Sequence, residues 1–291
     1  MKHSVVRVTG GVGNQLFQYA FGRALELAHG VGVRYDLSWF SAPAGSYVPR
    51  PFELDAFAVR AERADPWVSA LAKQQGSIFR ALGAGLFPSL VKDRSYREPR
   101  FSYTPIQTDE RIPRYYDGYW QSEKYFGRYA ETLRHELRSV RPPVGINAER
   151  ARMIQGCDAV SLHVRRADYL SHQGASATYA VLGADYYAHA LGMVLHERPS
   201  AHIFVFSDDP AWAQEHIRSS APVHFINGNT GIEDLGLMRM CGSHIIANSS
   251  FSWWGAWLSG SPDGMVIAPV KWFKNPNMDT RDLIPDRWRR L

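Results

Sequence analysis

The sequence predicts an α/β protein built on parallel β-sheet, and two observations support this prediction. The chain opens with an apolar strand, a glycine-rich turn, a helix and a second strand, over residues 5–37. Between residues 159 and 268, short apolar strands alternate with helical segments. Repeated β-α units with continuously apolar strands are typical of a parallel sheet that helices cover on both faces.

The opening unit is predicted to be a strand at residues 5–8, a helix at residues 14–29 and a strand at residues 31–37. The helix is predicted because apolar residues such as Leu16 and Ala20 recur at helical spacing. A glycine turn between a strand and a helix is the usual start of an α/β domain.

The middle of the chain is less regular. Residues 65–90 favour a helix with interruptions, residues 115–121 favour a strand, and residues 122–139 favour a charged helix. Pro142 and Pro143 then break the pattern. A proline pair favours a linker, so we place a domain boundary after Pro143.

The second half alternates strictly between strands and helices. Strands are predicted at residues 159–164, 201–206, 223–226, 244–247 and 265–268, and helices at residues 185–197, 210–219, 232–241 and 251–258. Ligands of such sheets bind beyond the carboxyl ends of the strands. The polar clusters of this half follow those strand ends, which predicts a binding site there.

Composition indicates a globular protein with a phosphorylated small ligand. With 45% apolar and 13% aromatic residues, the 291-residue chain can bury one large or two modest cores. The net charge is +5, but the basic residues are scattered and form no block of the nucleic-acid-binding type. We therefore expect a nucleotide ligand, with peripheral contact to an acidic membrane surface as a second use of the charge.

The start of the chain and its cysteine content favour the cytoplasm. The first residues run directly into a strand rather than into an apolar signal segment. Cys157 and Cys241 have neither the number nor the spacing of a disulfide framework or a zinc site. We therefore expect a soluble protein of a reducing compartment, peripheral at most on the inner face of a membrane.

The first polar cluster follows the first strand. Residues 10–15 read Gly-Gly-Val-Gly-Asn-Gln, where Gly11 and Gly13 let the backbone approach a ligand closely. The spacing is neither that of a dinucleotide-binding turn nor that of a P-loop. The glycines could equally serve only the turn, and Asn14 and Gln15 could be helix caps.

The second cluster, residues 163–168, follows the most apolar strand and reads His-Val-Arg-Arg-Ala-Asp. Strand alternation places His163 and Arg165 on one face. Guanidinium groups at this edge of a sheet suit a diphosphate, because each can donate two hydrogen bonds to phosphate oxygens. The plainer interpretation is a surface ion pair between Arg166 and Asp168.

The third cluster is the acidic pair Asp208 and Asp209. These carboxylates can accept hydrogen bonds from a guanine, a ribose or a sugar. They can equally cap the helix that begins at Pro210. No third oxygen ligand is adjacent, so a metal site is disfavoured.

The fourth cluster is at residues 248–252, where Asn248 precedes three serines at a helix N-terminus: Ser249, Ser250 and Ser252. Hydroxyl groups at a helix N-terminus suit phosphate, although capping requires only one of them. Trp253 and Trp254, which follow on an apolar helix, are expected in the core.

In this order, the clusters resemble glycosyltransferase family 11, the bacterial and animal α-1,2-fucosyltransferases. The similarity covers five blocks, at residues 10–20, 118–126, 163–168, 206–209 and 249–254, and so spans nearly the whole chain. The third block matches a motif that the family shares with α-1,6- and protein O-fucosyltransferases. Each block is ambiguous by itself, whereas the ordered set is specific.

The resemblance implies a GT-B type fold, with two Rossmann-like domains facing each other across a cleft. It implies transfer of L-fucose from GDP-β-L-fucose to the 2-hydroxyl of a terminal β-galactoside, in a glycan, an O-antigen or a capsule repeat. Inversion at the anomeric carbon and independence of metals are also implied. Residues 1–143 would form the acceptor-side domain and residues 144–291 the GDP-fucose-binding domain.

The resemblance also implies roles for particular residues. Arg165 or Arg166 would contact the β-phosphate. The chemistry of the transfer, rather than the resemblance, adds Asn14, to orient the acceptor or the phosphate, and Asp168, and these four residues are the predicted catalytic set. The predicted donor-binding residues are Gly11, Gly13, His163, Arg165, Asp208, Asp209, Asn248, Ser249, Ser250 and Ser252. The candidates for the general base are Asp168, Glu123 and Asp185.

Three other kinds of protein compete with this prediction. A GT-B transferase with α-1,3-fucosyl or rhamnosyl specificity would share the architecture and differ in donor or linkage. A non-catalytic nucleotide- or glycan-binding module would bind GDP without turnover. An NAD-dependent oxidoreductase is disfavoured by the glycine spacing and by arginine in the place of a ribose-binding acid.

Overall fold

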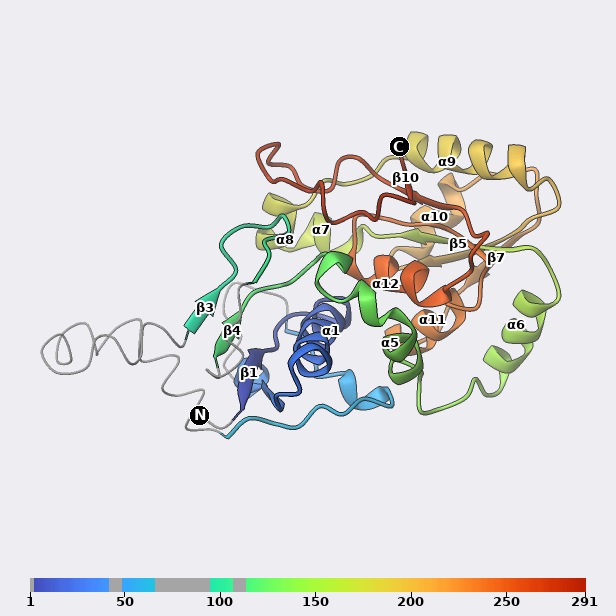
Figure 1. The fold of residues 1–291 in the computed structure, drawn as a ribbon. Helices are drawn as coiled ribbons and strands as arrows, with labels where there is room; N and C mark the ends of the chain where they lie inside the picture. Colours follow the sequence, from blue (N-terminus) through green and yellow to red (C-terminus); the bar gives the residue numbers. More distant parts are fainter. Residues whose placement is uncertain (1–2, 42–48, 66–94, 107–113) are drawn as a thin grey trace, which may run out of the picture.

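The computed structural model describes residues 3–41, 49–65, 95–106 and 114–291. Two separate, entirely parallel sheets form its framework (Figure 1). They confirm the predicted α/β class of the GT-B type, whereas the domain boundary after Pro143 stays a prediction. The helix predicted at residues 65–90 lies outside the described residues, apart from Asp65. No helix in the described ranges is long and apolar enough to span a membrane.

The first sheet belongs to the N-terminal half. Its strands are β1 (Ser4–Arg7), β2 (Val33–Asp36), β3 (Ser95–Arg97) and β4 (Tyr115–Asp117), in the order β2-β1-β4-β3. Helix α1 (Val12–His29) covers one face, where Phe21 packs edge-on against Tyr116 with ring centroids 5.3 Å apart. The predicted strand–helix–strand unit is confirmed. Strand β3 was not predicted, because three residues carry too short a pattern.

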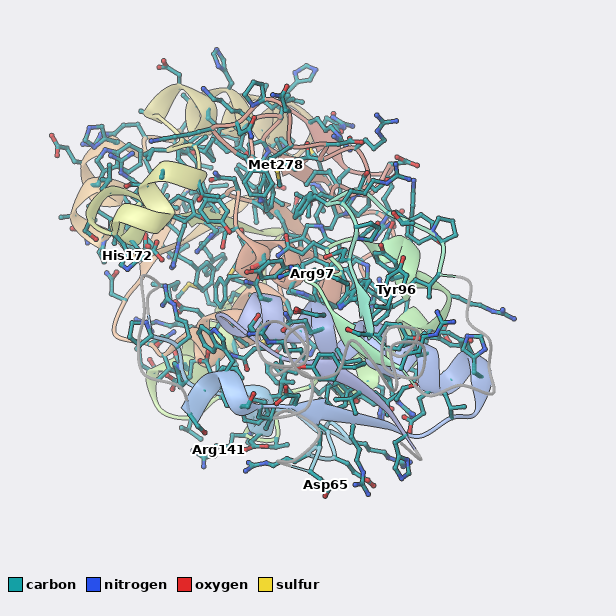
Figure 2. The ribbon with its side chains drawn as sticks, turned by 90° about the vertical axis from the view of Figure 1, so that its left-hand side faces the viewer. Asp65, Tyr96, Arg97, Arg141, His172 and Met278 are labelled. Carbon is teal, nitrogen blue, oxygen red and sulfur yellow. The ribbon has the colours of Figure 1, made fainter. Side chains whose placement is uncertain are left out.

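Strand alternation is visible at β3, where Tyr96 and Arg97 leave the strand on opposite sides (Figure 2). Tyr96 packs on Trp120 with ring centroids 6.1 Å apart, while the Arg97 side chain is 84% exposed. The aromatic side of this edge strand therefore faces the core and the charged side faces solvent.

The second sheet contains six parallel strands. They are β5 (Ala159–Val164), β6 (His202–Ser207), β7 (Val223–Ile226), β8 (Ser243–Ile245), β9 (Val266–Ala268) and β10 (Arg289–Arg290), in the order β10-β9-β8-β5-β6-β7. All five predicted strands are present. The sixth, β10, was missed because its two exposed arginines carry no apolar signal.

Helices cover both faces of the second sheet, as predicted. They are α6 (Ile146–Gln155), α7 (Ala167–Ser171), α8 (Gln173–Thr178), α9 (Ala184–Glu197), α10 (Pro210–His216), α11 (Gly231–Met238) and α12 (Ser250–Ser259). Leu162 and Val164 of β5 pack in one apolar cluster with α9 and α10. Phe204 and Phe206 of β6 pack in another with α6 and α11. Successive residues along each strand thus face opposite helical layers.

The two halves share a hydrophobic core, in which α1 lies against α12 (Figure 1). The Phe17 ring is 4.5 Å from that of Trp253 and 5.0 Å from that of Trp254. Both tryptophans are fully buried, so their predicted place in the core is confirmed. This packing holds the amino ends of α1 and α12 together, next to the predicted site.

The single charged helix predicted at residues 122–139 is wrong. The segment forms two short 3₁₀ turns, η3 (Glu123–Tyr125) and η4 (Gly127–Tyr129), before helix α5 (Ala130–Glu136). Phe126 interrupts the surface pattern, because its ring is buried and stacks on Trp254 at 5.5 Å. Tertiary packing of one aromatic residue thus outweighs the helical propensity of its neighbours.

The strand predicted at residues 115–121 ends early, at Asp117. Trp120 adopts a φ of +57°, which no strand residue has. The Glu98 carboxylate accepts hydrogen bonds from the backbone N–H groups of Tyr119, at 2.7 Å, and Trp120, at 3.2 Å. Stacking of the Trp120 ring on Phe21, at 4.0 Å, holds this strained turn in place.

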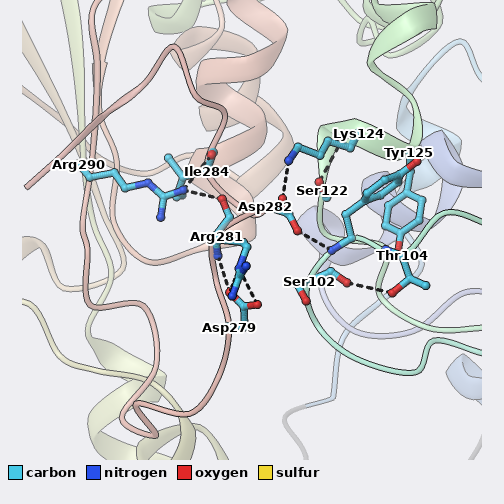
Figure 3. Close-up of polar contacts among 11 residues, drawn as sticks. Ser102, Thr104, Ser122, Lys124, Tyr125, Asp279, Arg281, Asp282, Ile284 and Arg290 are labelled. Carbon is cyan, nitrogen blue, oxygen red and sulfur yellow. Dashed lines mark hydrogen bonds and ion pairs between the residues drawn. The ribbon is translucent and has the colours of Figure 1, made fainter.

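The C-terminal segment returns to the N-terminal half and is fastened there by Asp282 (Figure 3). One Asp282 oxygen accepts from the backbone N–H of Tyr103, at 3.0 Å, and the other accepts from Lys124. Trp253 donates its indole N–H to the carbonyl of Leu283, at 2.8 Å. The two Asp282 contacts add a second connection between the halves besides the shared core, and the Trp253 contact anchors the segment to α12.

Candidate functional site

The predicted clusters meet where the chain leaves the carboxyl ends of both sheets. Arg50, from the N-terminal half, forms an ion pair with Asp168 of α7, and Asn14 of α1 accepts a hydrogen bond from Ser250 of α12. The first contact joins the N-terminal half to the second cluster, and the second joins the first cluster to the fourth. The third cluster is joined to the second by an ion pair between Arg165 and Asp208.

Arg165 follows β5 directly and lies at the centre of this site. Its guanidinium contacts Asp168 at 2.5 Å and Asp208 at 3.2 Å, and it lies 5.7 Å from the Tyr169 ring centroid. Burial opposes the charge, but the two carboxylates outweigh it and raise the pKa of Arg165. The side chain is therefore a permanent, preorganised cation at the carboxyl end of the sheet.

Arg166 points away from Arg165. Its guanidinium lies over the Trp212 ring, 4.0 Å from the centroid, and donates to the carbonyl of Leu182 at 3.1 Å. Its nearest acid is Asp209, at 3.8 Å. The surface ion pair between Arg166 and Asp168 is therefore wrong, because Trp212 holds Arg166 on the opposite side of the strand end.

The two acids of the third cluster have separate roles. Asp209 caps α10 by accepting from the Trp212 N–H at 3.2 Å, so the capping interpretation is confirmed for this residue. Asp208 instead accepts from the backbone N–H groups of Arg166, at 2.8 Å, and Ala167, at 3.2 Å. Asp208 thereby shapes the turn that carries Arg165. Nucleoside contacts of either acid stay a prediction.

His163 is buried on the face of β5 that is opposite to the face carrying Leu162 and Val164. Its ring lies 5.4 Å from Phe251, and its Nδ1 has no hydrogen-bond partner among the described residues. Burial, with a further contribution from Arg165, lowers the pKa of His163 to about 3. The imidazole is therefore neutral at physiological pH and can accept or donate a hydrogen bond to a ligand without adding charge.

The fourth cluster separates into capping, bridging and buried groups. Ser249 caps α12 by accepting from the Phe251 N–H at 3.3 Å. The Ser252 hydroxyl is buried and bonds to backbone carbonyls, whereas the Ser250 hydroxyl donates to Asn14 at 3.0 Å. Ser250 is thus the serine of this cluster that faces the N-terminal half.

Asn248 is fully buried and ties together the loops beneath α12. Its amide donates to the carbonyls of Ala180 and Trp272, both at 2.8 Å, and its own backbone carbonyl accepts from the Tyr169 hydroxyl at 2.9 Å. Its Oδ1 has no partner among the described residues. The predicted contact of Asn248 with the donor stays a prediction.

Gly11 and Gly13 allow close approach at the start of α1. A Cβ atom on Gly13 would lie 2.5 Å from the carbonyl carbon of Ser250 and 2.6 Å from the nitrogen of Phe251. Gly11 is the N-cap of α1 and makes no side-chain cap. The capping interpretation of Asn14 is wrong, because its Oδ1 instead accepts from Gln121 at 2.8 Å and from Ser250.

Gln15 is buried and fastens a distant segment to the glycine turn. Its amide donates to the carbonyls of Gly10, at 2.9 Å, and Pro51, at 2.8 Å, and its Oε1 accepts from the Glu53 N–H at 2.9 Å. Gln15 is therefore not a helix cap. It positions the residue that precedes Pro51, which is Arg50.

Arg50 is the residue of this site that sequence reasoning missed. Its side chain passes along Gly11, with its Cδ 3.8 Å from where a Cβ of that glycine would lie. Its guanidinium donates to the Asp168 carboxylate at 2.7 Å. In the sequence, Arg50 is only a basic residue beside a proline, and it does not lie at a fixed distance from any of the predicted clusters.

The candidate bases differ in how they are engaged. Glu123 pairs with the exposed Arg287 at 2.5 Å and accepts from the buried Trp257 indole at 2.9 Å, so both of its oxygens are already engaged. Asp185 is exposed in the first turn of α9, where an acid stabilises the helix dipole. Asp168 has one oxygen, Oδ2, shared by two guanidiniums, while its buried Oδ1 has no partner among the described residues.

Within the described ranges, no three or more His, Cys, Asp or Glu side chains gather into a group that could hold a metal ion. The carboxylates at the site, Asp168 and Asp208, are instead paired with guanidiniums. Independence of the reaction from metals stays a prediction, which chelation of divalent ions would test.

Comparison with known proteins identifies relatives of the whole chain. The family model described as "Glycosyl transferase family 11" matches residues 93–290. The chain is 32% identical over 300 residues to an alpha-1,2-colitosyltransferase of Escherichia coli, covering 99% of this chain and 98% of the relative. It is 29% identical over 309 residues to the O-antigen biosynthesis glycosyltransferase WbnK of Escherichia coli, covering 98% and 99%. A solved structure of the fucosyltransferase NodZ from Bradyrhizobium is 14% identical, with a TM-score of 0.46 over 87% of this chain and 91% of that chain.

Proposed function

This chain belongs to glycosyltransferase family 11, and we propose that it transfers L-fucose from GDP-β-L-fucose to the 2-hydroxyl of a terminal β-galactoside, with inversion and without a metal. An O-antigen or capsule repeat is the proposed acceptor, since a relative over the full length carries the name of an O-antigen biosynthesis glycosyltransferase. We place the reaction in the cytoplasm, with peripheral contact to the inner membrane surface.

One observation carries the proposal. The Arg165 guanidinium lies at the carboxyl end of β5, on the side of the second sheet where the amino ends of α1 and α12 converge at Gly13 and Ser250. A cation and two helix N-termini on the same side of a sheet favour an anionic group. A nucleoside diphosphate supplies such a group, and its departure develops negative charge at the same place.

Bond breaking would be assisted electrostatically. The bond between the anomeric carbon of fucose and the β-phosphate oxygen breaks with oxocarbenium character, and the electron pair remains on GDP. Arg165 would stabilise that charge as a fixed donor, together with the positive end of the α12 helix dipole. Arg166 would act indirectly, because its guanidinium is engaged by Trp212 and Leu182.

Asp168 is the base that we assign to the acceptor hydroxyl. Its Oδ1 is not bonded to any described residue, whereas its Oδ2 is held by Arg165 and Arg50. A carboxylate is a sufficient base here if the proton leaves late, after the glycosidic bond has largely broken. The acceptor oxygen then forms its bond to the anomeric carbon and its proton passes to Asp168.

The experiment is an assay of the purified protein with GDP-fucose and lactose, with and without EDTA. Release of GDP together with a fucosylated product that persists in EDTA is the expected result, and its linkage tests the α-1,2 assignment. Loss of activity in EDTA would contradict the metal-free mechanism. Slow hydrolysis of GDP-fucose without a product would retain the donor and reject lactose as an acceptor.

A second candidate donor sugar is colitose, because a relative at 32% identity is named as an alpha-1,2-colitosyltransferase. Colitose is L-fucose without its 3-hydroxyl. A site that hydrogen-bonds this hydroxyl discriminates strongly against the deoxy sugar, whereas an apolar site does not. Competition between the GDP derivatives of the two sugars in one reaction distinguishes these cases by the ratio of products.

A further inference from the structure

The N-terminal half contributes a cation, Arg50, to the site, and hydrogen bonds of the neighbouring backbone fix the position of this residue. The Arg50 side chain is 33% exposed, so it lies at the opening of the site, and its guanidinium reaches across to Asp168 of the other half. The adjacent backbone is clamped by Gln15, which bonds to Pro51 and Glu53. A buried glutamine that satisfies three backbone groups over a separation of up to 38 residues holds this segment in one place.

The two guanidinium groups that contact Asp168 are positioned to bind a phosphate. Arg50 and Arg165 donate to the same oxygen, Asp168 Oδ2, at 2.7 Å and 2.5 Å. Two guanidiniums that meet at one carboxylate oxygen are arranged to bind an oxyanion, because the carboxylate occupies the position that a phosphate oxygen can take. A diphosphate carries more charge than one carboxylate and accepts more hydrogen bonds, so it competes well for these donors.

We propose that Arg50 is a phosphate-binding residue that changes partner, from Asp168 in the free protein to the donor diphosphate in the complex. This inference rests on the proposed function, because it takes a nucleoside diphosphate as the ligand. When Arg50 moves to the diphosphate, the Asp168 Oδ2 oxygen keeps Arg165 as its guanidinium partner. Binding of the donor thus releases one contact of the carboxylate that we assign to receive the acceptor proton.

Arg198 provides a matched control. It forms an ion pair with Asp158 at 2.9 Å, and the two side chains are 26% and 28% exposed, close to the values of 33% and 18% for Arg50 and Asp168. Asp158 immediately precedes β5, so this pair lies at the amino end of the strand, opposite to the site. Arg198→Gln therefore removes an arginine–aspartate ion pair of similar exposure, but at the amino end of the sheet, away from the site.

The experiment measures binding of GDP, GMP and guanosine by calorimetry to the full-length protein and to Arg50→Gln, Arg50→Lys and Arg198→Gln. Arg50→Gln is expected to weaken GDP binding about 10-fold and to leave guanosine binding within about 2-fold, since a hydrogen bond to a charged group is lost. Arg50→Lys should recover part of the loss, and Arg198→Gln should bind like the unaltered protein. Thermal melting of each variant verifies folding.

The outcomes separate the two proposals. If the unaltered protein binds GDP and Arg50→Gln binds it equally well, the role of Arg50 is wrong while the proposed donor class stands. If guanosine and GDP weaken equally in Arg50→Gln, the residue acts on the fold of the site and not on phosphate, which also rejects the inference. If the unaltered protein does not bind GDP, the proposed function fails and the inference fails with it.

Discussion

Gly13 of α1 lies directly against Ser250 of α12, so closely that a Cβ atom on the glycine would be 2.5 Å from the serine carbonyl carbon. Atoms at that separation overlap, and backbone atoms in the first turn of a helix cannot move aside singly. The contact joins helices of the two halves next to the proposed diphosphate site. It makes the spacing between the halves sensitive to a single methyl group.

Gly13→Ala is expected to separate the amino ends of α1 and α12. Overpacking of this kind costs about 1–3 kcal/mol of stability, and we expect activity to fall at least 10-fold because the Asn14–Ser250 hydrogen bond is lost. Gly192→Ala is the control, since nothing lies within 4 Å of a Cβ there and alanine favours a helix interior. Equal activity and melting temperatures for the two variants would contradict the close contact.

Arg165→Lys tests the leaving-group role. The lysine keeps the positive charge between Asp168 and Asp208 but loses the planar pair of donors. We expect kcat to fall on the order of 100-fold, the typical effect of removing one preorganised donor, with little change in the melting temperature. Arg166→Lys should instead lower the melting temperature, because it loses the contact with Trp212. Turnover of Arg165→Lys within a few-fold of the unaltered protein would remove Arg165 from the mechanism.

Asp282→Asn tests the fastening of the C-terminal segment shown in Figure 3. The Asp282 side chain is 11% exposed and serves both Tyr103 and Lys124. Loss of its charge should lower the melting temperature by several degrees. Asp279→Asn alters a neighbouring, more exposed pair with Arg281 and should melt like the unaltered protein. The comparison is read by calorimetry; indistinguishable melting of both variants would show that the fastening contributes nothing.

The buried His244 predicts how stability responds to acid. Burial lowers its pKa to about 3, below the ordinary value of 6.5, so the folded protein binds fewer protons than the unfolded chain between these values. The stabilisation is complete above pH 6.5 and is lost as the pH falls toward 3. Each such histidine contributes up to about 1.4 kcal/mol per pH unit.

Urea unfolding at several pH values measures this slope. His244→Gln should reduce the dependence of the unfolding free energy on pH between 6.5 and 4, while His189→Gln, at an exposed position on α9, should not. A slope unchanged in His244→Gln would mean that His244 is protonated in the folded protein.

The order of elements could be predicted because it depends on local patterns. The apolar runs at β5, β6 and β8 and the helical spacing in α1 are properties of a few consecutive residues. The segment between Ser122 and Ser139 could not be predicted in the same way. There Phe126 breaks the helix to enter a core whose partners, such as Trp254, lie more than a hundred residues away.

The site was predicted in part. Residues at the ends of neighbouring parallel strands meet at one edge of a sheet, which is why Arg165 and Asp208 could be expected together. Arg50 could not be expected, since it reaches the site only through the hydrogen bonds of Gln15 to residues 51 and 53. No spacing in the sequence encodes that contact.

By itself, then, the sequence determined the parallel α/β architecture, because this follows from short-range periodicity. It also determined that the polar residues of the site lie at the carboxyl ends of the strands, because this follows from where the strands end. The tertiary structure decided the partner of each charge. Asp168 pairs with Arg165 and Arg50 instead of Arg166, because Trp212 draws Arg166 to the other side of the strand end. Such choices depend on side chains brought together from distant segments, where packing and charge act at a few ångströms.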